Sequence, residues 1–417
     1  MKTFRHPRFF FVITCFIFTA ISLAFSGQTI AQETGGDIEI DAAADEFEKY
    51  QKAIEDQYSA YETDIEQEYE KYRQIIEEEY KACERKILRT WVIAEMSTEK
   101  KWVEYSSDYQ SRQIVDFEEG YIQLDIITEA EIERRIDEVL RQRLRDAITE
   151  DQNTAFQRDP VAQNVENRLK DTTSDLKTGQ VGDRPVLLKA ITGKADPTDQ
   201  EIDEAVARLK EQARITRSDD TAKTGSVVSL RVSLPPNTLQ QKAMEYKPYV
   251  DAYAAERGLN RSLVFAIMHT ESAFNPMARS PVPAYGLMQI VPRSAGKDAT
   301  KLLYGQQTLL SPSYLYTEQN NINIGTAYLY LLYNRYLKAI KNPTSRIYCT
   351  IAAYNTGAGN VARAFTGTSN INRAARVINQ MSPTDVYYHL QRNLPYQETR
   401  DYLERVTKRM AMYRSMQ

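Results

Sequence analysis

The first clear pattern along the chain is an eleven-residue repeat of apolar positions over residues 47–90. Each repeat places aromatic or aliphatic residues at three equivalent positions, as in Tyr58, Tyr61 and Ile65. Eleven residues make close to three turns of an α-helix, so these positions form one stripe that hardly drifts around the helix. The pattern predicts a straight helix of roughly 65 Å, at about 1.5 Å per residue.

A stripe of this length must be covered by other apolar groups, and two explanations stay open. Residues 47–90 are either a surface for self-association or for a partner protein, or a solvated amphipathic helix that packs against its own domain. Cys83 occupies a stripe position that otherwise holds Tyr, so we expect it to fill core space.

Beyond residue 100 the hydrophobic period changes from about 3.6 to 2, which indicates strands. The turn 118–120 is expected to join the last two strands as a hairpin. Thr128 is then expected to begin a helix, with Glu131 completing a capping box. The expected strands are 102–105, 112–117 and 121–126.

Residues 151–225 are polar and interrupted by Pro and Gly, with one helix expected at about 198–213. A further strand is expected at 226–234, where Pro235 ends it. No catalytic constellation is visible before this point. The segment resembles a small α+β platform that carries the long helix.

From residue 237 onward the pattern is helical almost throughout, which predicts a compact, mostly α domain of usual size. The expected helices are 238–257, 261–271, 294–303, 321–337, 345–355, 357–365, 373–379, 383–390 and 397–413. The fold class is therefore α+β. Its predicted parts are a signal peptide at 1–31, the long repeat helix at 32–100, an α+β domain at 101–236 and a helical domain at 237–417.

The first 31 residues have the layout of a secretory signal. Three basic residues precede the almost wholly apolar segment 9–25, and small residues precede Gln32. The apolar segment is long for a signal, so an uncleaved membrane anchor is the alternative. Either way we expect export to the periplasm. Cys15 follows the bulky Thr14, so lipidation is not expected.

The net charge of −4 hides a division along the chain. Residues 244–417 hold 20 Lys and Arg against 10 Asp and Glu, whereas residues 32–243 hold 30 against 47. A basic domain in an exported protein suits an anionic polymer outside the membrane. The basic residues are dispersed rather than clustered, which argues against nucleic acid. No metal-ligand spacing appears among the histidines, and no metal or cofactor is expected.

Glu271 is the first candidate for chemistry. It ends an apolar helical segment, 263–268, and Pro276 prevents that helix from continuing far beyond it. Burial and the negative end of the helix dipole both disfavour a charged carboxylate, so its pKa should be raised. A carboxylic acid that is protonated near neutral pH is suited to donating a proton to a glycosidic oxygen.

Three later segments supply groups that suit a sugar ligand. Residues 286–290 combine a glycine turn, two apolar side chains and an amide. Residues 353–359 place an aromatic ring and an amide before glycines that let a ligand approach the backbone. Residues 394–402 add another aromatic cluster. Each segment alone is a weak signal. Together with the Glu271 segment and in this order, the four segments are a strong signal.

Together these motifs resemble the soluble lytic transglycosylase catalytic domain, which shares its lysozyme-like fold with goose-type lysozyme. They read Glu-Ser-x-Phe-Asn-Pro, Gly-Leu-Met-Gln, Ala-Tyr-Asn-x-Gly and Glu-Thr-Arg-x-Tyr, within about residues 244–413. Residues 342–346 and 381–387, and residues 105–112 and 116–120 of the N-terminal module, resemble one membrane-bound subgroup of this family. The eleven-residue repeat and the absence of a lipidation cysteine depart from it.

The resemblance implies that Glu271 is the sole catalytic acid and base. It would protonate the oxygen between N-acetylmuramic acid and N-acetylglucosamine, then take the proton of the muramyl C6 hydroxyl. That hydroxyl attacks C1 and leaves a 1,6-anhydro end without water. Ser272 is expected to support the helix end. The residues implied to bind glycan strands of peptidoglycan are Ser280, Met288, Gln289, Tyr354, Asn355 and Tyr402.

Two alternatives remain at the level of sequence. A muramidase would hydrolyse the same bond, commonly with a second carboxylate across it. The cleft motifs offer none between Glu271 and Asp298, although Asp298, Glu398 and Asp401 are candidates if the chain folds back. A non-catalytic peptidoglycan-binding scaffold is the alternative from a different class.

Overall fold

The computed structural model describes residues 70–416, with gaps at 174 and 282. The predicted signal at 1–31 and the part of the repeat before residue 70 lie outside the described residues. The described chain belongs to one compact unit. Within it, no helix is both long and apolar enough to cross a membrane.

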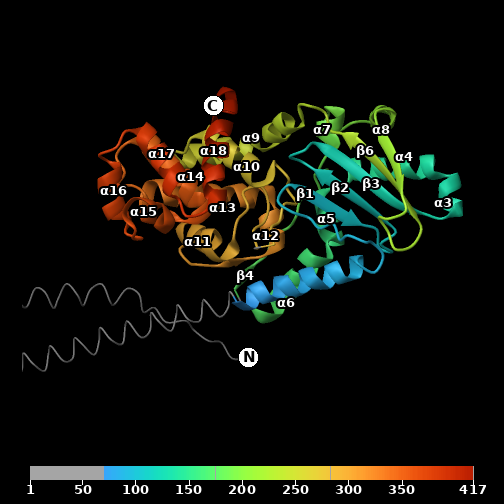
Figure 1. The fold of residues 1–417 in the computed structure, drawn as a ribbon, viewed down its shortest axis with the longest axis horizontal. Helices are drawn as coiled ribbons and strands as arrows, with labels where there is room; N and C mark the ends of the chain where they lie inside the picture. Colours follow the sequence, from blue (N-terminus) through green and yellow to red (C-terminus); the bar gives the residue numbers. More distant parts are fainter. Residues whose placement is uncertain (1–69, 174, 282, 417) are drawn as a thin grey trace, which may run out of the picture. The chain divides into compact units, whose positions relative to one another are not determined.

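An antiparallel five-stranded sheet organises the first half of the described chain, in the order β1-β2-β3-β6-β5 (Figure 1). β1 pairs with β2, with Lys101 opposite Asp116, and the β2–β3 hairpin pairs from Ser111 opposite Ile126 to Asp116 opposite Tyr121. The turn of this hairpin contains Gly120 at φ +71°. The strands are β1 (Lys101–Tyr105), β2 (Ser111–Asp116), β3 (Tyr121–Thr128), β5 (Arg214–Ser218) and β6 (Ser226–Ser233).

The predicted strands are confirmed, but the capping box at Thr128 is wrong. Thr128 is the last residue of β3, and its hydroxyl donates to the carbonyl of Ser226 in β6. A capping box does occur at Thr198 and Glu201, at the start of the helix expected there. The helices of this half are α3 (Ala130–Arg134), α4 (Ile136–Thr149), α5 (Gln152–Arg158), α6 (Pro160–Thr172), α7 (Leu188–Thr192) and α8 (Asp199–Glu211).

Residues 70–87, the described end of the repeat, form a helix whose apolar stripe packs on its own chain. Tyr72, Ile76 and Ile87 are buried, and Cys83 lies with them as a free, buried thiol. On the polar side, Arg168 of α6 forms ion pairs with two glutamates of this helix. Local packing therefore accounts for this part of the stripe.

The second half of the chain is a bundle of helices gathered around α10 and α13 (Figure 1). The bounds of the predicted helix 238–257 are confirmed, whereas two expected helices contain π-helical turns, η1 and η2, and α12 was not predicted. The elements are α9 (Thr238–Arg257), α10 (Arg261–Ser272), η1 (Pro292–Gly296), α11 (Lys297–Tyr304), α12 (Pro312–Tyr316), α13 (Glu318–Leu331), η2 (Leu332–Tyr336), α14 (Pro343–Thr356), α15 (Ala358–Thr366), α16 (Ile371–Ile378), α17 (Pro383–Asn393), α18 (Gln397–Met412) and η3 (Arg414–Met416).

The two halves are tied together by buried polar contacts. Arg279, just beyond α10, makes two hydrogen bonds to the carboxylate of Asp159, at 2.8 and 2.6 Å. Asp159 also caps α6 by accepting from two backbone N–H groups. A short parallel pair, β4 (Leu176–Lys177) with β7 (Leu309–Leu310), joins the halves at a second place. The sheet half is thus fastened directly beside the predicted catalytic segment.

Candidate active site

The helix that carries Glu271 is buried on all sides. Every residue from Ser262 to Thr270 is buried, as expected for a helix that is apolar around its whole circumference. Asn260 begins α10 by accepting from the N–H of Leu263. The helix ends at Ala273, which adopts the left-handed conformation at φ +50° and donates its N–H to the carbonyl of His269.

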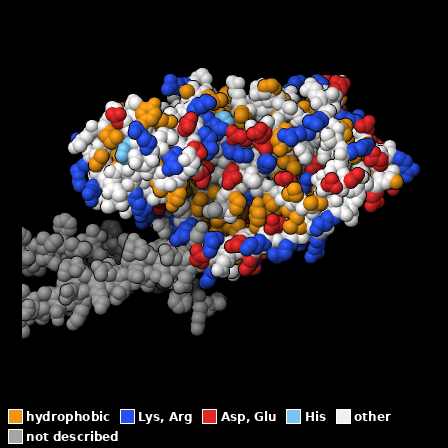
Figure 2. Space-filling model, viewed as in Figure 1, with side chains coloured by type: hydrophobic (Ala, Val, Ile, Leu, Met, Phe, Trp, Pro, Cys, Tyr) orange, Lys and Arg blue, Asp and Glu red, His pale blue; other side chains and the backbone are white. Residues whose placement is uncertain are grey.

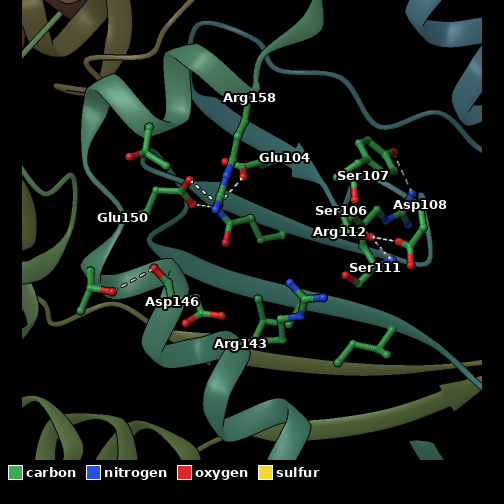
Figure 3. A pocket seen from close by; sticks show the side chains of 16 residues that line it. Glu104, Ser106, Ser107, Asp108, Ser111, Arg112, Arg143, Asp146, Glu150 and Arg158 are labelled. Atoms are coloured by element: carbon green, nitrogen blue, oxygen red, sulfur yellow. Dashed lines mark hydrogen bonds and ion pairs between the residues drawn. The ribbon is translucent and has the colours of Figure 1, made fainter. Parts of the chain in front are cut away.

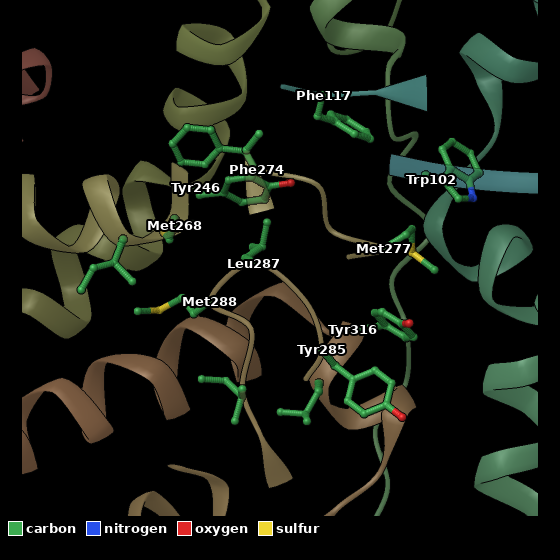
Figure 4. Close-up of a cluster of buried hydrophobic side chains, with 14 of the residues drawn as sticks. Trp102, Phe117, Tyr246, Met268, Phe274, Met277, Tyr285, Leu287, Met288 and Tyr316 are labelled. Atoms are coloured by element: carbon green, nitrogen blue, oxygen red, sulfur yellow. The ribbon is translucent and has the colours of Figure 1, made fainter. Parts of the chain in front are cut away.

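The backbone after Glu271 is strained. Three of the four non-glycine residues with positive φ in the described ranges lie at this site: Ala273, Phe274 and Gln289. For a bulky residue such as Phe274 this conformation is unfavourable and must be enforced by packing. The Phe274 ring stacks with those of Tyr246 and His269, at centroid distances of 6.3 and 5.7 Å. Figure 4 shows Phe274 beside Tyr246 in the core.

The second motif, around Gly286, forms a tight turn clamped by one amide. The fully buried Asn321 of α13 donates to the carbonyls of Tyr285 and Leu315 and accepts from the N–H of Met288, each at 2.8 Å. Gly286 has φ +72°, and a Cβ there would lie 2.3 Å from the Asn321 amide nitrogen. Only glycine fits at this position, for both reasons.

Glu271 contacts α18, and the neighbouring Ser272 contacts this turn. The Tyr402 hydroxyl donates to Glu271 Oε1 at 2.6 Å, while Glu271 remains partly exposed. Ser272 donates to the carbonyls of Met268 and Leu287, so it fastens the helix end to the turn. This is the supporting position that the sequence predicts for Ser272.

Burial dominates the electrostatics of Glu271 and raises its pKa to about 7. The hydrogen bond from Tyr402 and the positive charge of Lys100 lower the pKa, whereas the charges of Glu99 and Glu398 raise it. Half of the Glu271 carboxyls are therefore protonated near neutral pH. Such a group can both donate and accept a proton under physiological conditions.

The aromatic motif at the end of α14 also reaches this site. The Tyr354 hydroxyl donates to the carbonyl of Met288 at 2.8 Å, and the charge of Glu271 contributes to raising the Tyr354 pKa. The side-chain oxygen of Asn355 accepts from Thr399 of α18 at 2.6 Å. The structure thus brings together Glu271, Tyr354, Asn355 and Tyr402 from three helices.

The three remaining predicted residues take different positions. The Met288 side chain lies in the buried core shown in Figure 4 and occupies the space beside Gly325, while its backbone carbonyl accepts from Tyr354. Gln289 donates to the carbonyl of Gly286, and its buried Oε1 has no partner among the described residues. Ser280 is partly exposed, and its N–H donates to the carbonyl of Ala284.

The other carboxylates considered from the sequence are engaged or exposed. Asp298 accepts from the hydroxyl of Tyr336, and Asp401 accepts from Gln397. Glu398 is exposed; its charge acts on Glu271, but no hydrogen bond joins the two in the described structure. Of these four carboxylates, Glu271 is the one that accepts from Tyr402 and whose charge acts on Tyr354 in the described structure.

A cavity of about 670 Å³ lies in the sheet half between β1, β2, α4 and α5 (Figure 3). It contains a carboxyl pair, Glu104 and Glu150, which share the Nη1 atom of Arg158 at 3.2 and 2.9 Å. Burial raises the pKa of both carboxyls. None of the predicted site residues lines this cavity, so it is separate from the site of Glu271.

Sequence reasoning did not identify Asn321, Gly325 and Lys100 as parts of the site. Asn321 and Gly325 share one face of α13, four residues apart, but nothing in their spacing indicates that they meet the Gly286 turn. Lys100 reaches α10 from the sheet half, 169 residues earlier in the chain. Such contacts depend on tertiary packing alone.

The comparison with known proteins begins with the helical half of the chain. The Transglycosylase SLT domain family matches residues 248–377, which include Glu271, Tyr354 and the Gly286 turn. Two solved structures also match: an inactive mutant of the lytic transglycosylase Slt from Pseudomonas aeruginosa, at 29% identity and TM-score 0.32, and the 70 kDa soluble lytic transglycosylase from Escherichia coli, at 28% and 0.32. They cover 42% and 41% of this chain, and about a quarter (24%) of their own.

The full-length relatives then define the family. A membrane-bound lytic murein transglycosylase C from Klebsiella pneumoniae is 38% identical over 318 residues, which cover 76% of this chain and 82% of the relative. One from Cronobacter sakazakii is 37% identical over the same length, with the same coverage. The chain belongs to this family of lytic murein transglycosylases, and it is an enzyme.

We predict that Asn321→Ala weakens both the turn and the fold. The substitution leaves the Leu315 carbonyl and the Met288 N–H without partners and removes one of two donors to the Tyr285 carbonyl, which should lower the free energy of unfolding by about 3 kcal/mol. Guanidinium unfolding measures this loss. The control is Asn320→Ala on the preceding, half-buried residue, expected within about 0.5 kcal/mol of the parent protein. Equal stability of the two variants would contradict the role given to Asn321.

Proposed function

We propose that the protein cleaves the β-1,4 bond between N-acetylmuramic acid and N-acetylglucosamine in peptidoglycan and leaves 1,6-anhydro-N-acetylmuramic acid ends. The observation that carries this proposal is the single, partly exposed carboxyl of Glu271 with a pKa raised to about 7. Membership of the lytic murein transglycosylase family supports the same substrate.

In this proposal Glu271 acts twice. Its protonated form donates to the glycosidic oxygen as the bond to C1 breaks, and the resulting carboxylate accepts the proton of the C6 hydroxyl, which bonds to C1. After both steps the Glu271 carboxyl is again protonated and uncharged, as it was at the start. The Tyr402 hydroxyl stabilises the carboxylate between the two steps, because its hydrogen bond favours the ionised form.

The remaining predicted residues would hold the sugars around this carboxyl. Tyr354 and Asn355, both partly exposed, offer an aromatic ring and an amide beside Glu271, whereas the buried Tyr402 acts through its hydroxyl on Glu271. Gln289 Oε1 offers an acceptor without a partner in the described chain, suited to an N–H or O–H group of the glycan. Ser280 completes the proposed set, while Met288 contributes through its backbone.

The surface charge is compatible with a polymeric anion. Figure 2 shows Lys and Arg side chains scattered over the helical half rather than gathered in one patch. Dispersed positive charge favours a long anionic polymer without selecting one phosphate-like group. This is compatible with peptidoglycan strands as the partner.

We predict that Glu271→Gln abolishes lysis of purified sacculi while binding to them persists. The loss should be at least 100-fold, since the variant keeps the shape of the side chain but cannot transfer the proton. Turbidity loss and mass spectrometry of the released muropeptides measure lysis and product ends.

The matched control for this experiment is Glu398→Gln, which removes the exposed neighbouring carboxylate. We expect it to keep most of the activity and to release 1,6-anhydro ends. Reducing ends throughout, or a dead Glu398→Gln variant, would favour the hydrolytic alternative with two carboxylates. Binding without lysis by the parent protein would favour a scaffold.

The pH dependence of kcat/KM should follow the Glu271 carboxyl. The first proton transfer needs the protonated acid, so activity is expected to fall as the pH rises through about 7. Tyr402→Phe removes a hydrogen bond to the ionised form, which raises the pKa and moves this descending limb to higher pH. A limb that stays in place or moves to lower pH in Tyr402→Phe would contradict this account.

We further propose that residues 1–31 direct export to the periplasm and that residues 9–25 attach the protein to the membrane if they are retained. The relatives are named membrane-bound, which supports this location. We also propose the division into parts at 1–31, 32–100, 101–236 and 237–417, and a self-association or partner role for residues 47–90, of which the described part packs on its own chain. N-terminal sequencing of the mature protein should begin near residue 32; a chain beginning at Met1 would contradict cleavage.

A further inference from the structure

The last turn of α10 is held by a lysine from the sheet half of the chain. Lys100, the residue before β1, donates from Nζ to the carbonyl of His269 at 2.9 Å and to that of Thr270 at 2.6 Å. The final carbonyls of a helix have no partners within the helix. Thr270 immediately precedes Glu271, so the Lys100 ammonium lies at the end of the helix where the catalytic carboxyl begins.

Two further charges complete this junction. Arg409 of α18 donates to the same His269 carbonyl at 3.2 Å. Glu118, in the turn between β2 and β3, pairs with Lys100 Nζ at 3.0 Å and also with Arg409. The β2–β3 hairpin, the start of β1, α18 and the end of α10 therefore meet at one charged cluster.

The segment 98–100 also supports the strained backbone beyond Glu271. The carbonyl of Glu99 accepts from the side-chain amide of Asn275 at 3.4 Å, and the carbonyl of Thr98 accepts from the N–H of Arg279 at 3.4 Å. These bonds hold residues that follow Ala273 and Phe274 in the chain, whereas the Lys100 bonds hold residues that precede them. The same three residues thus fix the chain on both sides of the catalytic carboxyl.

Burial and nearby charges shift the pKa values of Lys100 and His269 at this junction. Burial, the largest effect, lowers the pKa of Lys100; the charges of Glu118 and Glu271 raise it, and that of Arg409 lowers it further. Burial and Arg409 lower the pKa of His269 to about 3, so this histidine is neutral. The groups that face Glu271 are Tyr402 and Glu398 from α18, Tyr354 from α14, and Glu99 and Lys100 from the segment before β1.

We propose that Lys100 is a positioning residue for Glu271: its ammonium fixes the end of α10, and its charge partly offsets the burial of the catalytic carboxyl. The proposal rests on the proposed function, in which Glu271 is the acid and base. Lys100 acts through the helix end and through its charge, without contact to the glycan. The sheet half of the chain thereby takes part in the reaction at the helical half.

The test compares Lys100→Met with Lys100→Arg in the full chain, by the pH profile of kcat/KM on purified sacculi. Loss of the positive charge disfavours the ionised Glu271, so the descending limb should move up by about one pH unit in Lys100→Met. Lys100→Arg keeps the charge and should keep the limb of the parent protein, with a lower kcat where its geometry fits the two carbonyls less well. The neighbouring control is Lys101→Met, whose partner is Asp116 and whose limb should not move.

A purely structural role for Lys100 would lower stability and activity without moving the limb, and that result overturns the proposal. Circular dichroism and guanidinium unfolding establish first that the variants fold. If Lys100→Met does not fold, Lys100→Gln, which removes the charge but keeps hydrogen-bond donors, takes its place: a limb shifted upward supports the proposal, and an unmoved limb overturns it. Glu271→Gln in the same assay distinguishes a failure of the proposed function from a failure of the Lys100 proposal alone. If Glu271→Gln stays active, the proposed function fails; if it is inactive and the Lys100→Met limb is unmoved, only the Lys100 proposal fails.

Discussion

The site depends on how one helix ends. α10 must stop within one residue of Glu271 so that the carboxyl stands at the edge of the core, and stopping a buried helix leaves carbonyls without partners. Water cannot satisfy them there, so other parts of the chain must. Ala273 supplies a backbone N–H, Lys100 an ammonium and Arg409 a guanidinium. The catalytic geometry is consequently a property of the whole described unit.

The same constraint sets the chemistry. A carboxyl at the end of a buried helix is desolvated, which raises its pKa. The Tyr402 hydroxyl and the Lys100 charge oppose burial, and the balance falls at about 7. A tyrosine donor is suited to this task because it stabilises the ionised form without the strong shift that a directly bonded arginine would cause. One carboxyl can then serve as acid and as base in a single turnover.

The sequence predicted well what local chemistry decides. The bounds of α9, the end of α10 near Glu271 and the β2–β3 hairpin follow from periodicity and from glycine and proline signals. The helices of residues 151–172 were missed because few apolar residues mark them, although Asp151 and Asp159 cap them. Thr128 failed as a cap because a neighbouring strand offered its hydroxyl a better partner. The partners of Glu271 in α14 and α18 were predicted by motif, whereas Lys100 and Asn321 were not, because only tertiary packing brings them there.

Arg279 shows why the sheet half and the catalytic segment form one unit. Its guanidinium is buried, lies 5.7 Å from the Tyr80 ring of the repeat helix and binds Asp159, which also begins α6. Its backbone belongs to the chain between Phe274 and the Gly286 turn, and that backbone bonds to Thr98. A shift of the repeat helix, of α6 or of the segment before β1 would thus act on the residues that position Glu271. Because a buried guanidinium separated from its carboxylate is costly, these elements are expected to move with the site rather than independently of it.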